Sequence, residues 1–379
     1  MSDGNRLLNL KMGCVRRFSG TSKIRNGGRR FNRKQIVKWF KRINGKSSQG
    51  GNLMQLTTEQ LSTWKRDGII VVPNVFPQEV IAPALEEIER NAYDGLTYTE
   101  YHAKWGAQPE ALKSAYEKHS DMQRLAGPFG KAVHFPTGLE AVDKLIENEA
   151  YLAIAKQLLD TEEIRLGYGQ IFFREGLTDS RHSEHPWQGY HIDNATNSPL
   201  PPHPDWQRYG YVLTAIFVHD IELDGAPMLV CPGSQNQLDK IWVKYPGRAG
   251  GMGIPDLREF KEELGDPVPL TAKAGSVSFR SSYLVHAAQP FENKSRQRGW
   301  MGYHFHRADN DDWCKTTRPV PGWGTPQYMK FVAQTTPDVR RVLGWPAPGD
   351  AYYTPEALAR LEVAYPGIDL EPYRKTSKA

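Results

Sequence analysis

A histidine and an aspartate stand two residues apart within the stretch from Gly189 to Asn194, as His191 and Asp193. On an extended segment, residues two apart point to the same face, so the imidazole and the carboxylate would lie side by side. Those are two of the three protein ligands of a mononuclear non-haem Fe(II) oxygenase, whose other metal positions stay open. The third ligand would be a distant histidine on a strand that returns beside the first. His286 is the candidate.

His-x-Asp is a short motif, and this chain has 11 histidines. A second copy occurs at His203 and Asp205, in a proline-rich segment that begins near Ser198. Because proline cannot donate to a sheet ladder, we expect that segment to be a loop or lid. We expect His203 to face the surface or the substrate. Most single histidines are structural, so the interpretation of His191 and Asp193 depends on further motifs.

The composition is that of a folded protein, with 379 residues of which 39% are hydrophobic and 11% aromatic. That length allows one to three domains. No apolar run approaches the length of a transmembrane helix, so we expect none. The three cysteines have neither disulfide nor zinc-ligand spacing, which suits a reducing compartment. They are Cys14, Cys231 and Cys314.

The net charge of +5 is concentrated at the N-terminus, where residues 1–48 contain 14 Lys and Arg and one acid. We expect residues 1–51 to form a basic, largely disordered extension. One helical face of apolar residues, from Ile36 to Ile43, allows three interpretations. It is a helix packed on its own domain, a mitochondrial presequence, or a contact to a membrane surface or nucleic acid. No folded nucleic-acid module is expected, and the cytoplasm is the expected compartment, with the mitochondrion as alternative.

The first part of the folded region is expected to be helical with one strand. Thr57 can cap a helix in which Gln60 closes a capping box. A buried strand over residues 69–72 and amphipathic helices over 77–93 and 142–159 are expected to follow.

From residue 164 onward, short runs of β-branched and aromatic residues alternate with clusters of Gly, Pro and Asp. No helical crossovers separate these runs, which argues against a doubly wound parallel sheet. The pattern predicts a mainly β fold with flanking helices, in which a jelly roll (a cupin-like double-stranded β-helix) forms the core. Strands are expected over residues 164–173, 189–193, 211–219, 228–231, 276–279 and 299–306.

Three parts of the chain are therefore expected: the extension over residues 1–51, an oxygenase jelly roll over 52–320, and a helical tail over 321–379 packed on the core. Within the second, the long Gly- and Pro-punctuated loop over residues 242–269 is a candidate lid. Within the tail, three Thr-Pro pairs each predict a cap followed by proline at the first helical position. They are Thr325-Pro326, Thr336-Pro337 and Thr354-Pro355.

Read together, these motifs resemble the phytanoyl-CoA dioxygenase family of Fe(II)/2-oxoglutarate-dependent oxygenases. The likeness runs roughly from Leu56 to His306 and includes the opening helix and strand. It continues with the hairpin Phe217–Met228, the turn Pro232–Gln235 and the stretch Ala274–Val277 that leads to His286. Each motif is weak alone, and their order along the chain is that of the family.

The resemblance implies that His191, Asp193 and His286 bind Fe(II). It also implies that Arg298 binds the far carboxylate of 2-oxoglutarate, since a planar guanidinium can hold a carboxylate through two hydrogen bonds. Arg296 is the rival, because a strand would send it to the same face.

Gln170 and Thr214 match positions where the family places polar contacts to the cosubstrate, although both residue types are equally suited to a plain structural role. The chain departs from the family in two places. Tyr190 stands where many members have Trp, and the loop after His286 is slightly longer than expected. Both departures loosen the alignment near Arg298.

The implied reaction consumes O2 and 2-oxoglutarate, releases succinate and CO2, and oxidises an unactivated C–H bond of a small molecule, with ascorbate as a stimulating reductant. Halogenating relatives replace the aspartate ligand with a small residue, so Asp193 favours hydroxylation or a related oxidation. Two alternatives stay open: a non-catalytic jelly-roll binding protein, and a cupin-type metalloenzyme that does not use 2-oxoglutarate. Six residues near the motifs are candidate pocket residues or ordinary core and surface residues: Trp187, Tyr190, Trp206, Tyr209, Tyr211 and Arg280.

Overall fold

The computed structural model describes residues 55–93, 95–106, 108, 133–177, 190–193, 203, 205–238, 261–310 and 326–374. The predicted basic extension, Trp187, Thr325 and most of the candidate lid over residues 242–269 lie outside these ranges. Within them, no helix is both long enough and apolar enough to cross a membrane.

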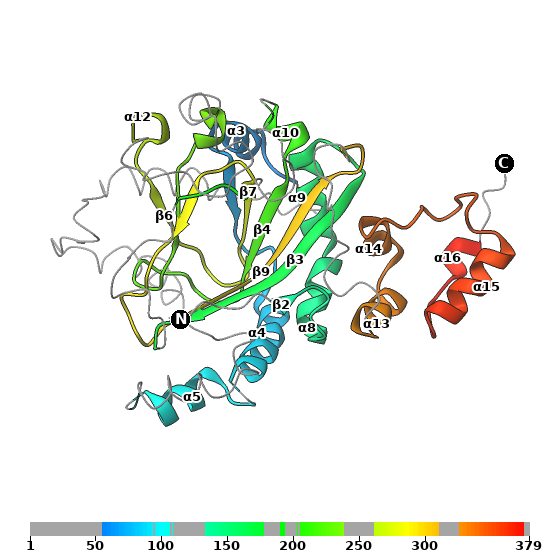
Figure 1. Cartoon of the computed structure of the whole chain (residues 1–379), viewed down its shortest axis with the longest axis horizontal. Helices are drawn as coiled ribbons and strands as arrows, with labels where there is room; N and C mark the ends of the chain where they lie inside the picture. The colour runs from blue at the N-terminus through cyan, green and yellow to red at the C-terminus, as the bar shows by residue number, and fades with distance from the viewer. Residues whose placement is uncertain are drawn as a thin grey trace, which may run out of the picture. The chain divides into compact units, whose positions relative to one another are not determined.

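The larger of two antiparallel sheets has six strands in the order β1-β7-β4-β9-β3-β2. Its two longest strands, β3 and β9, run side by side through the centre of Figure 1 and pair from Ile164↔Arg307 to Glu175↔Gln297. The strands are β1 (Ile69–Val72), β2 (Val133–His134), β3 (Ile164–Glu175), β4 (Val212–Phe217), β7 (Val277–Ser281) and β9 (Gln297–Arg307).

The smaller sheet has three strands in the order β6-β5-β8. These strands are β5 (Met228–Val230), β6 (Val268–Leu270) and β8 (His286–Ala288). Two antiparallel sheets of short, non-sequential strands form a double-stranded β-helix core. The predicted fold class, mainly β with flanking helices, is confirmed.

Helices precede and flank the larger sheet. Thr57 and Gln60 form the predicted capping box at the start of α3 (Thr58–Asp67). The others before β3 are α4 (Gln78–Ala92), α5 (Tyr98–Trp105), α8 (Glu140–Asp143), the 3-10 helix η1 (Lys144–Glu147) and α9 (Glu149–Leu159). Short helices α10 (Trp206–Tyr209), η4 (Ser234–Asn236) and α12 (Lys261–Leu264) follow.

The prediction of one helix over residues 142–159 is wrong, because the chain leaves the helical conformation at Asn148. Its backbone is extended there (φ −70°, ψ 112°), and its side chain accepts a hydrogen bond from the N–H of Tyr151. Asparagine is a strong N-cap residue, so it starts a new helix, α9, where the periodicity alone suggested continuity.

Helix α9 packs on one face of the larger sheet and leaves the other face to the pocket described below. The ring of Tyr151 lies 5.8 Å from Phe279, 6.1 Å from Tyr303 and 5.7 Å from Phe305. Since side chains alternate along a strand, the even-numbered residues of β9 from 298 to 304 face the opposite way. This alternation decides which residues of β9 can reach the site.

The predicted strand over residues 189–193 is reduced to a single bridge, between His191 and His286. Among the four described residues of this segment, 190–193, His191 is the one that takes part in a bridge. One bridge is nevertheless enough to fix the register between the two histidines.

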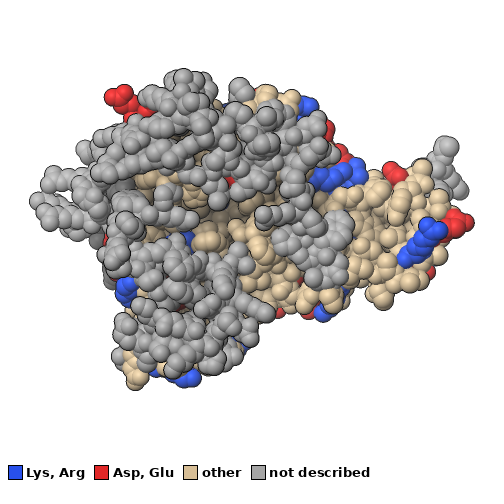
Figure 2. Space-filling model, viewed as in Figure 1, with Lys and Arg blue, Asp and Glu red and all other residues tan. Residues whose placement is uncertain are grey.

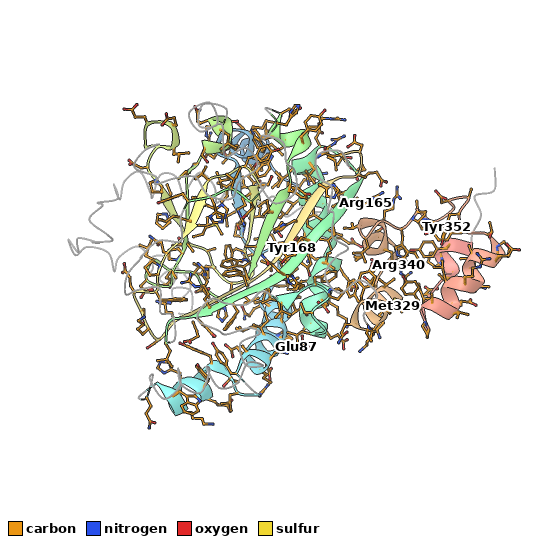
Figure 3. The ribbon with its side chains drawn as sticks, viewed as in Figure 1. Glu87, Arg165, Tyr168, Met329, Arg340 and Tyr352 are labelled. Carbon is orange, nitrogen blue, oxygen red and sulfur yellow. The ribbon has the colours of Figure 1, made fainter. Side chains whose placement is uncertain are left out.

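The C-terminal segment is helical, as the Thr-Pro pairs predicted: Thr336 and Thr354 cap α14 (Pro337–Val342) and α15 (Pro355–Ala364). The remaining helices are α13 (Pro326–Gln334) and α16 (Glu371–Arg374). Arg340, labelled between α14 and the last helices in Figure 3, donates to three backbone carbonyl groups. On the visible face of the last helices, acidic and basic side chains lie close together, consistent with the ion pair between Arg374 and Glu362 (Figure 2).

Candidate metal centre

Two histidines from distant parts of the chain face each other in one antiparallel bridge. The N–H of His191 donates to the carbonyl of His286 at 3.0 Å, and the N–H of His286 donates back at 3.0 Å. Side chains of directly opposed residues stand on the same face of a sheet. The two imidazole rings accordingly have centroids 4.3 Å apart.

Asp193 brings its carboxylate to the same place. Its backbone N–H donates to the carbonyl of Ser282 at 3.0 Å, which ties this segment to the turn before β8. Its Oδ1 lies 3.6 Å from Nε2 of His191, and its Oδ2 lies 3.5 Å from Nε2 of His286. The three candidate ligand atoms all lie within 4.8 Å of one another. Two imidazoles and one carboxylate at this spacing fit an Fe(II) ion and leave coordination positions open.

The protonation states of His286 and Asp193 suit metal binding. Nδ1 of His286 donates to the carbonyl of Leu284 at 3.0 Å, because a carbonyl can only accept. This leaves the lone pair of Nε2 facing Asp193, and burial lowers the pKa of His286 to about 3. Burial would raise the pKa of Asp193, but the nearby His286, Arg280 and His191 hold it well below its usual range. A neutral imidazole and an ionised carboxylate therefore meet at neutral pH.

Arg280, on β7, donates from Nη2 to Oδ2 of Asp193 at 2.7 Å. A charge-assisted bond of this kind fixes the orientation of a carboxylate. With one oxygen held by the guanidinium, Oδ1 is turned toward His191. Arg280 thus orients the carboxylate of a predicted metal ligand.

The three groups open onto a cavity of about 110 Å³. The predicted cosubstrate residue Arg298 also lines this cavity, and only 1% of its surface is exposed. Its Nη1 donates to the carbonyl of Ala226, and its guanidinium lies 4.3 Å from the ring centroid of Trp300. A guanidinium held in this way presents a defined direction to a carboxylate.

The rival arginine, Arg296, belongs to a surface ion-pair cluster. Its Nη2 lies 3.0 Å from Glu222 and its Nε 2.6 Å from Asp224. It does not line the cavity. Its N–H donates to the carbonyl of Asn293, in the turn before β9, and Arg298 is the one of the two arginines that lines the cavity.

Gln170 lines the cavity from β3. Its Oε1 accepts a hydrogen bond from the hydroxyl of Tyr168 at 2.9 Å, and the same hydroxyl lies 2.7 Å from Nδ1 of His134. Tyr168 is labelled over the sheet in Figure 3. Because the oxygen of the amide is engaged, the NH2 group is the part of Gln170 left to serve as a donor.

Thr214 has its hydroxyl on the other face of the sheet, although the residue contributes to the cavity wall. Its Oγ1 lies 2.6 Å from the hydroxyl of Tyr151 on α9 and 3.0 Å from the carbonyl of Tyr303, to which it donates. Direct contact between the Thr214 hydroxyl and a cosubstrate would break its hydrogen bonds with both Tyr151 and Tyr303. The contacts therefore support the structural interpretation of Thr214.

Trp300 and His304 are among the cavity-wall residues that were not singled out from the sequence. Both follow Arg298 at intervals of two along β9, so strand alternation from Arg298 would have found them. The ring of Trp300 stacks on Phe172 at 4.9 Å. Burial lowers the pKa of His304 to about 4.

Of the described candidate pocket residues, Arg280 lines the cavity and the aromatic ones do not. Trp206 packs edge-on against Trp64 at 5.3 Å and donates to Asn236. His203, from the second His-x-Asp copy, lies 4.0 Å from the ring of Tyr209 and is no part of the three-ligand cluster.

A larger hollow of about 1040 Å³ lies elsewhere, between α9 and α14. Its wall includes Glu147, Glu149, Glu163 and Asp338, and it contains none of the three candidate metal ligands. A choice of site by cavity volume alone would therefore have selected a hollow that lacks the candidate metal ligands.

The family model for phytanoyl-CoA dioxygenase (PhyH) matches residues 64–299, which is more than half of the chain. The chain belongs to the phytanoyl-CoA dioxygenase family. It is an Fe(II)- and 2-oxoglutarate-dependent dioxygenase, and the predicted enzyme class and the cofactors iron and 2-oxoglutarate are confirmed, with O2 implied by that class. The predicted stimulation by ascorbate stays a prediction.

Similar proteins include ectoine dioxygenase from Bordetella bronchiseptica and from Bordetella parapertussis. Each is 21% identical over 243 residues, which cover 62% of this chain and 70% of the relative. Among solved structures, EctD from S. alaskensis with 2-oxoglutarate and 5-hydroxyectoine has a TM-score of 0.47 at 16% identity, covering 70% of this chain and 80% of that one. The epimerase SnoN in complex with Fe3+, alpha ketoglutarate and nogalamycin RO has a TM-score of 0.43 at 17% identity, covering 65% and 82%.

Proposed function

We propose that this dioxygenase oxidises an unactivated C–H bond of a small-molecule metabolite, by hydroxylation or a related oxidation, and releases succinate and CO2. The observation that carries the proposal is the convergence of His191, Asp193 and His286 on one cavity that Arg298 also lines. A ligand set alone would suit several metalloenzymes, and a buried arginine in the same small cavity adds a partner for a dicarboxylate cosubstrate.

In this proposal His191, Asp193 and His286 hold the iron, and Arg298 binds the far carboxylate of 2-oxoglutarate. The iron, when bound with 2-oxoglutarate and O2, supplies the oxidising power for C–H cleavage. The task of the protein is to position these groups. Asp193 is ionised and oriented by Arg280, and His286 is kept neutral with Nε2 toward the site.

The remaining wall restricts access and orientation. Trp300 and Phe172 stack at 4.9 Å beside the guanidinium of Arg298, which gives the cosubstrate site an apolar side. The NH2 group of Gln170 is available to an acceptor on the ligand. A dry, preorganised site strengthens such electrostatic contacts.

Succinate release tests the proposal. The protein, loaded with Fe(II) and 2-oxoglutarate in air, should release succinate faster when a suitable metabolite from a screening panel is added. His191→Ala should abolish this stimulation, and His203→Ala, in the second His-x-Asp copy, should leave it intact. Equal turnover in wild type and His191→Ala would show that the metal lies elsewhere.

We further propose the part boundaries expected from the sequence: residues 1–51 as an extension outside the catalytic unit, 52–320 as the oxygenase jelly roll and 321–379 as a helical tail. The tail contacts the core through Arg341 and Glu163, 2.7 Å apart, and through Thr335 and Glu147, also 2.7 Å apart. The proposed compartment is the cytoplasm. Sequencing the N-terminus of the native protein tests this, since a cleaved basic segment would indicate mitochondrial import.

A further inference from the structure

Arg280 is a buried cation that uses only part of its hydrogen-bonding capacity. The residue is 7% exposed, and its Nη2 donates to Asp193. Its Nε and Nη1 have no hydrogen-bond partner among the described residues. A guanidinium carries five N–H donors, and burying charged donors without acceptors is costly. Such donors generally meet an acceptor from an ordered water, an ion or a ligand.

The cavity wall around Arg280 has an excess of positive charge. Arg280 and Arg298 both line it, and Asp193 is the one acidic side chain in its described wall. That carboxylate is also the predicted metal ligand, so it cannot neutralise both arginines. A metal ion adds further positive charge, and the cosubstrate removes some of it.

The two arginines are placed for different partners. Arg298 comes from β9 and lies against the ring of Trp300, whereas Arg280 comes from β7 and contacts a predicted metal ligand directly. An anion bound to an unpartnered nitrogen of Arg280 would therefore lie close to the predicted metal ligands. This is the position of the substrate, not of the far end of the cosubstrate.

We infer that Arg280 binds a carboxylate of the substrate, and hence that this enzyme acts on an anionic small molecule. The inference rests on the proposed function and names the substrate class for the same site. The cavity of about 110 Å³ favours a planar carboxylate over a bulkier phosphate. Arg280 has two tasks in this arrangement: Nη2 orients Asp193, and one of the N–H groups that has no partner among the described residues holds the substrate.

The carboxylate on Arg280 could also come from the cosubstrate, because the carboxylate of 2-oxoglutarate nearest the metal is an oxyanion too. The two sources differ in what the loss of Arg280 weakens. If Arg280 holds the substrate, Arg280→Gln weakens the binding of carboxylate probes more than that of a cosubstrate analogue, when both are measured with the metal saturating. If it holds the cosubstrate, the binding of the analogue is weakened more.

Calorimetric titration of the full chain, loaded with Mn(II) and the unreactive cosubstrate analogue N-oxalylglycine, distinguishes these cases. The probes are matched pairs: acetate with acetamide, benzoate with benzamide, and hexanoate with hexanamide. In the wild type, at least one carboxylate should bind about tenfold more tightly than its carboxamide, as expected for a charge-assisted bond. Arg280→Gln should reduce that preference to about twofold or less, and Arg280→Lys should retain part of it because the charge remains.

Arg208→Gln is the matched control, since Arg208 is a partly exposed arginine paired with Asp309 at 3.4 Å and lies outside the cavity wall. It should leave the preference unchanged. Metal content and N-oxalylglycine affinity, measured first on every variant, show whether the site itself is intact. No preference for any carboxylate in a wild type that binds metal and N-oxalylglycine overturns the inference while the proposed function stands. Failure to bind metal or N-oxalylglycine at all overturns the proposed function.

Discussion

Two buried arginines show how differently one side chain is used in this protein. Arg340, in the C-terminal helices, is 1% exposed and donates from Nε, Nη1 and Nη2 to the carbonyl groups of Val332, Asp369 and Ala333. Arg280, in the cavity wall, is nearly as buried, but only its Nη2 donates, to Asp193. Its Nε and Nη1 have no partner among the described residues. The difference in bonding fits a structural role for Arg340 and a place at a ligand site for Arg280.

Substitutions in these two regions should have opposite effects on stability and activity. Side chains around the cavity face a place reserved for ligands, so their removal should cost little stability and much activity. Side chains around Arg340 close a small core that includes Tyr353, Leu370 and Tyr373, so their removal should do the reverse.

The largest effect is expected from His191→Ala. Loss of one of three metal ligands should reduce substrate-dependent succinate formation by more than about a hundredfold, since even outer-shell changes around metals cost 10–100-fold. The side chain is 19% exposed, so the free energy of unfolding of the metal-free protein should change by less than about 1 kcal/mol. Turnover and urea denaturation measure the two quantities, and a metal-free variant destabilised by several kcal/mol would contradict the contrast.

Arg340→Met should show the opposite behaviour. Removal of the guanidinium leaves three carbonyl groups without their donor, which should lower the free energy of unfolding by about 2–4 kcal/mol. Folded protein should still bind 2-oxoglutarate with unchanged affinity. Arg374→Gln, at an exposed ion pair with Glu362, is the control and should cost less than about 1 kcal/mol. If both variants are equally stable by urea denaturation, Arg340 has no special role.

Arg298→Gln should weaken 2-oxoglutarate binding about 10–100-fold, because a charge-assisted contact becomes a neutral one. Arg296→Gln, two residues earlier and just before β9, removes the surface ion pairs with Glu222 and Asp224 and should leave the affinity within about twofold. Anaerobic titration of the metal-loaded protein measures both affinities. A larger loss in the Arg296 variant would reverse the assignment of the cosubstrate arginine.

The smallest effect concerns pH, at a buried acid outside both regions. Burial raises the pKa of Asp143 to about 6, although hydrogen bonds from Thr137 and Gly138 oppose the rise. The folded state then holds the proton more tightly than the unfolded state, whose pKa is near 3.8. Stability from this group is complete below the unfolded pKa and is lost as pH rises through about 6.

The Asp143→Asn variant cannot lose stability in this way, because an asparagine side chain does not titrate in this pH range. Between about pH 4 and pH 7, the wild type should therefore lose about 2 kcal/mol of unfolding free energy relative to the variant. Urea denaturation of both proteins across this range gives the difference. Parallel pH curves for the two proteins would show that Asp143 titrates normally.

Much of the fold could be predicted because its signals are local. The capping box at Thr57 and Gln60 and the caps at Thr336 and Thr354 need only residues a few positions apart. The long strands β3 and β9 were also predicted, since their apolar runs are unambiguous. The break at Asn148 was missed because apolar periodicity continues across it and only the cap residue marks the boundary.

The site was harder, because its geometry depends on which face each strand turns inward. The sequence identified His191, Asp193 and His286 from their types, and the structure brings them together. It could not show that the hydroxyl of Thr214 points to α9, since that depends on the register of β4 against β7, Thr214↔Phe279. The partnership between Arg280 and Asp193 likewise joins residues far apart in the chain, which no local pattern encodes.

Anomalous diffraction at the iron edge, from crystals grown without O2 in the presence of Fe(II) and 2-oxoglutarate, would locate the metal and the cosubstrate together. We expect a single strong peak within bonding distance of His191, Asp193 and His286, with the far carboxylate of 2-oxoglutarate on Arg298. An iron peak in another part of the molecule, or 2-oxoglutarate bound away from Arg298, would contradict this expectation.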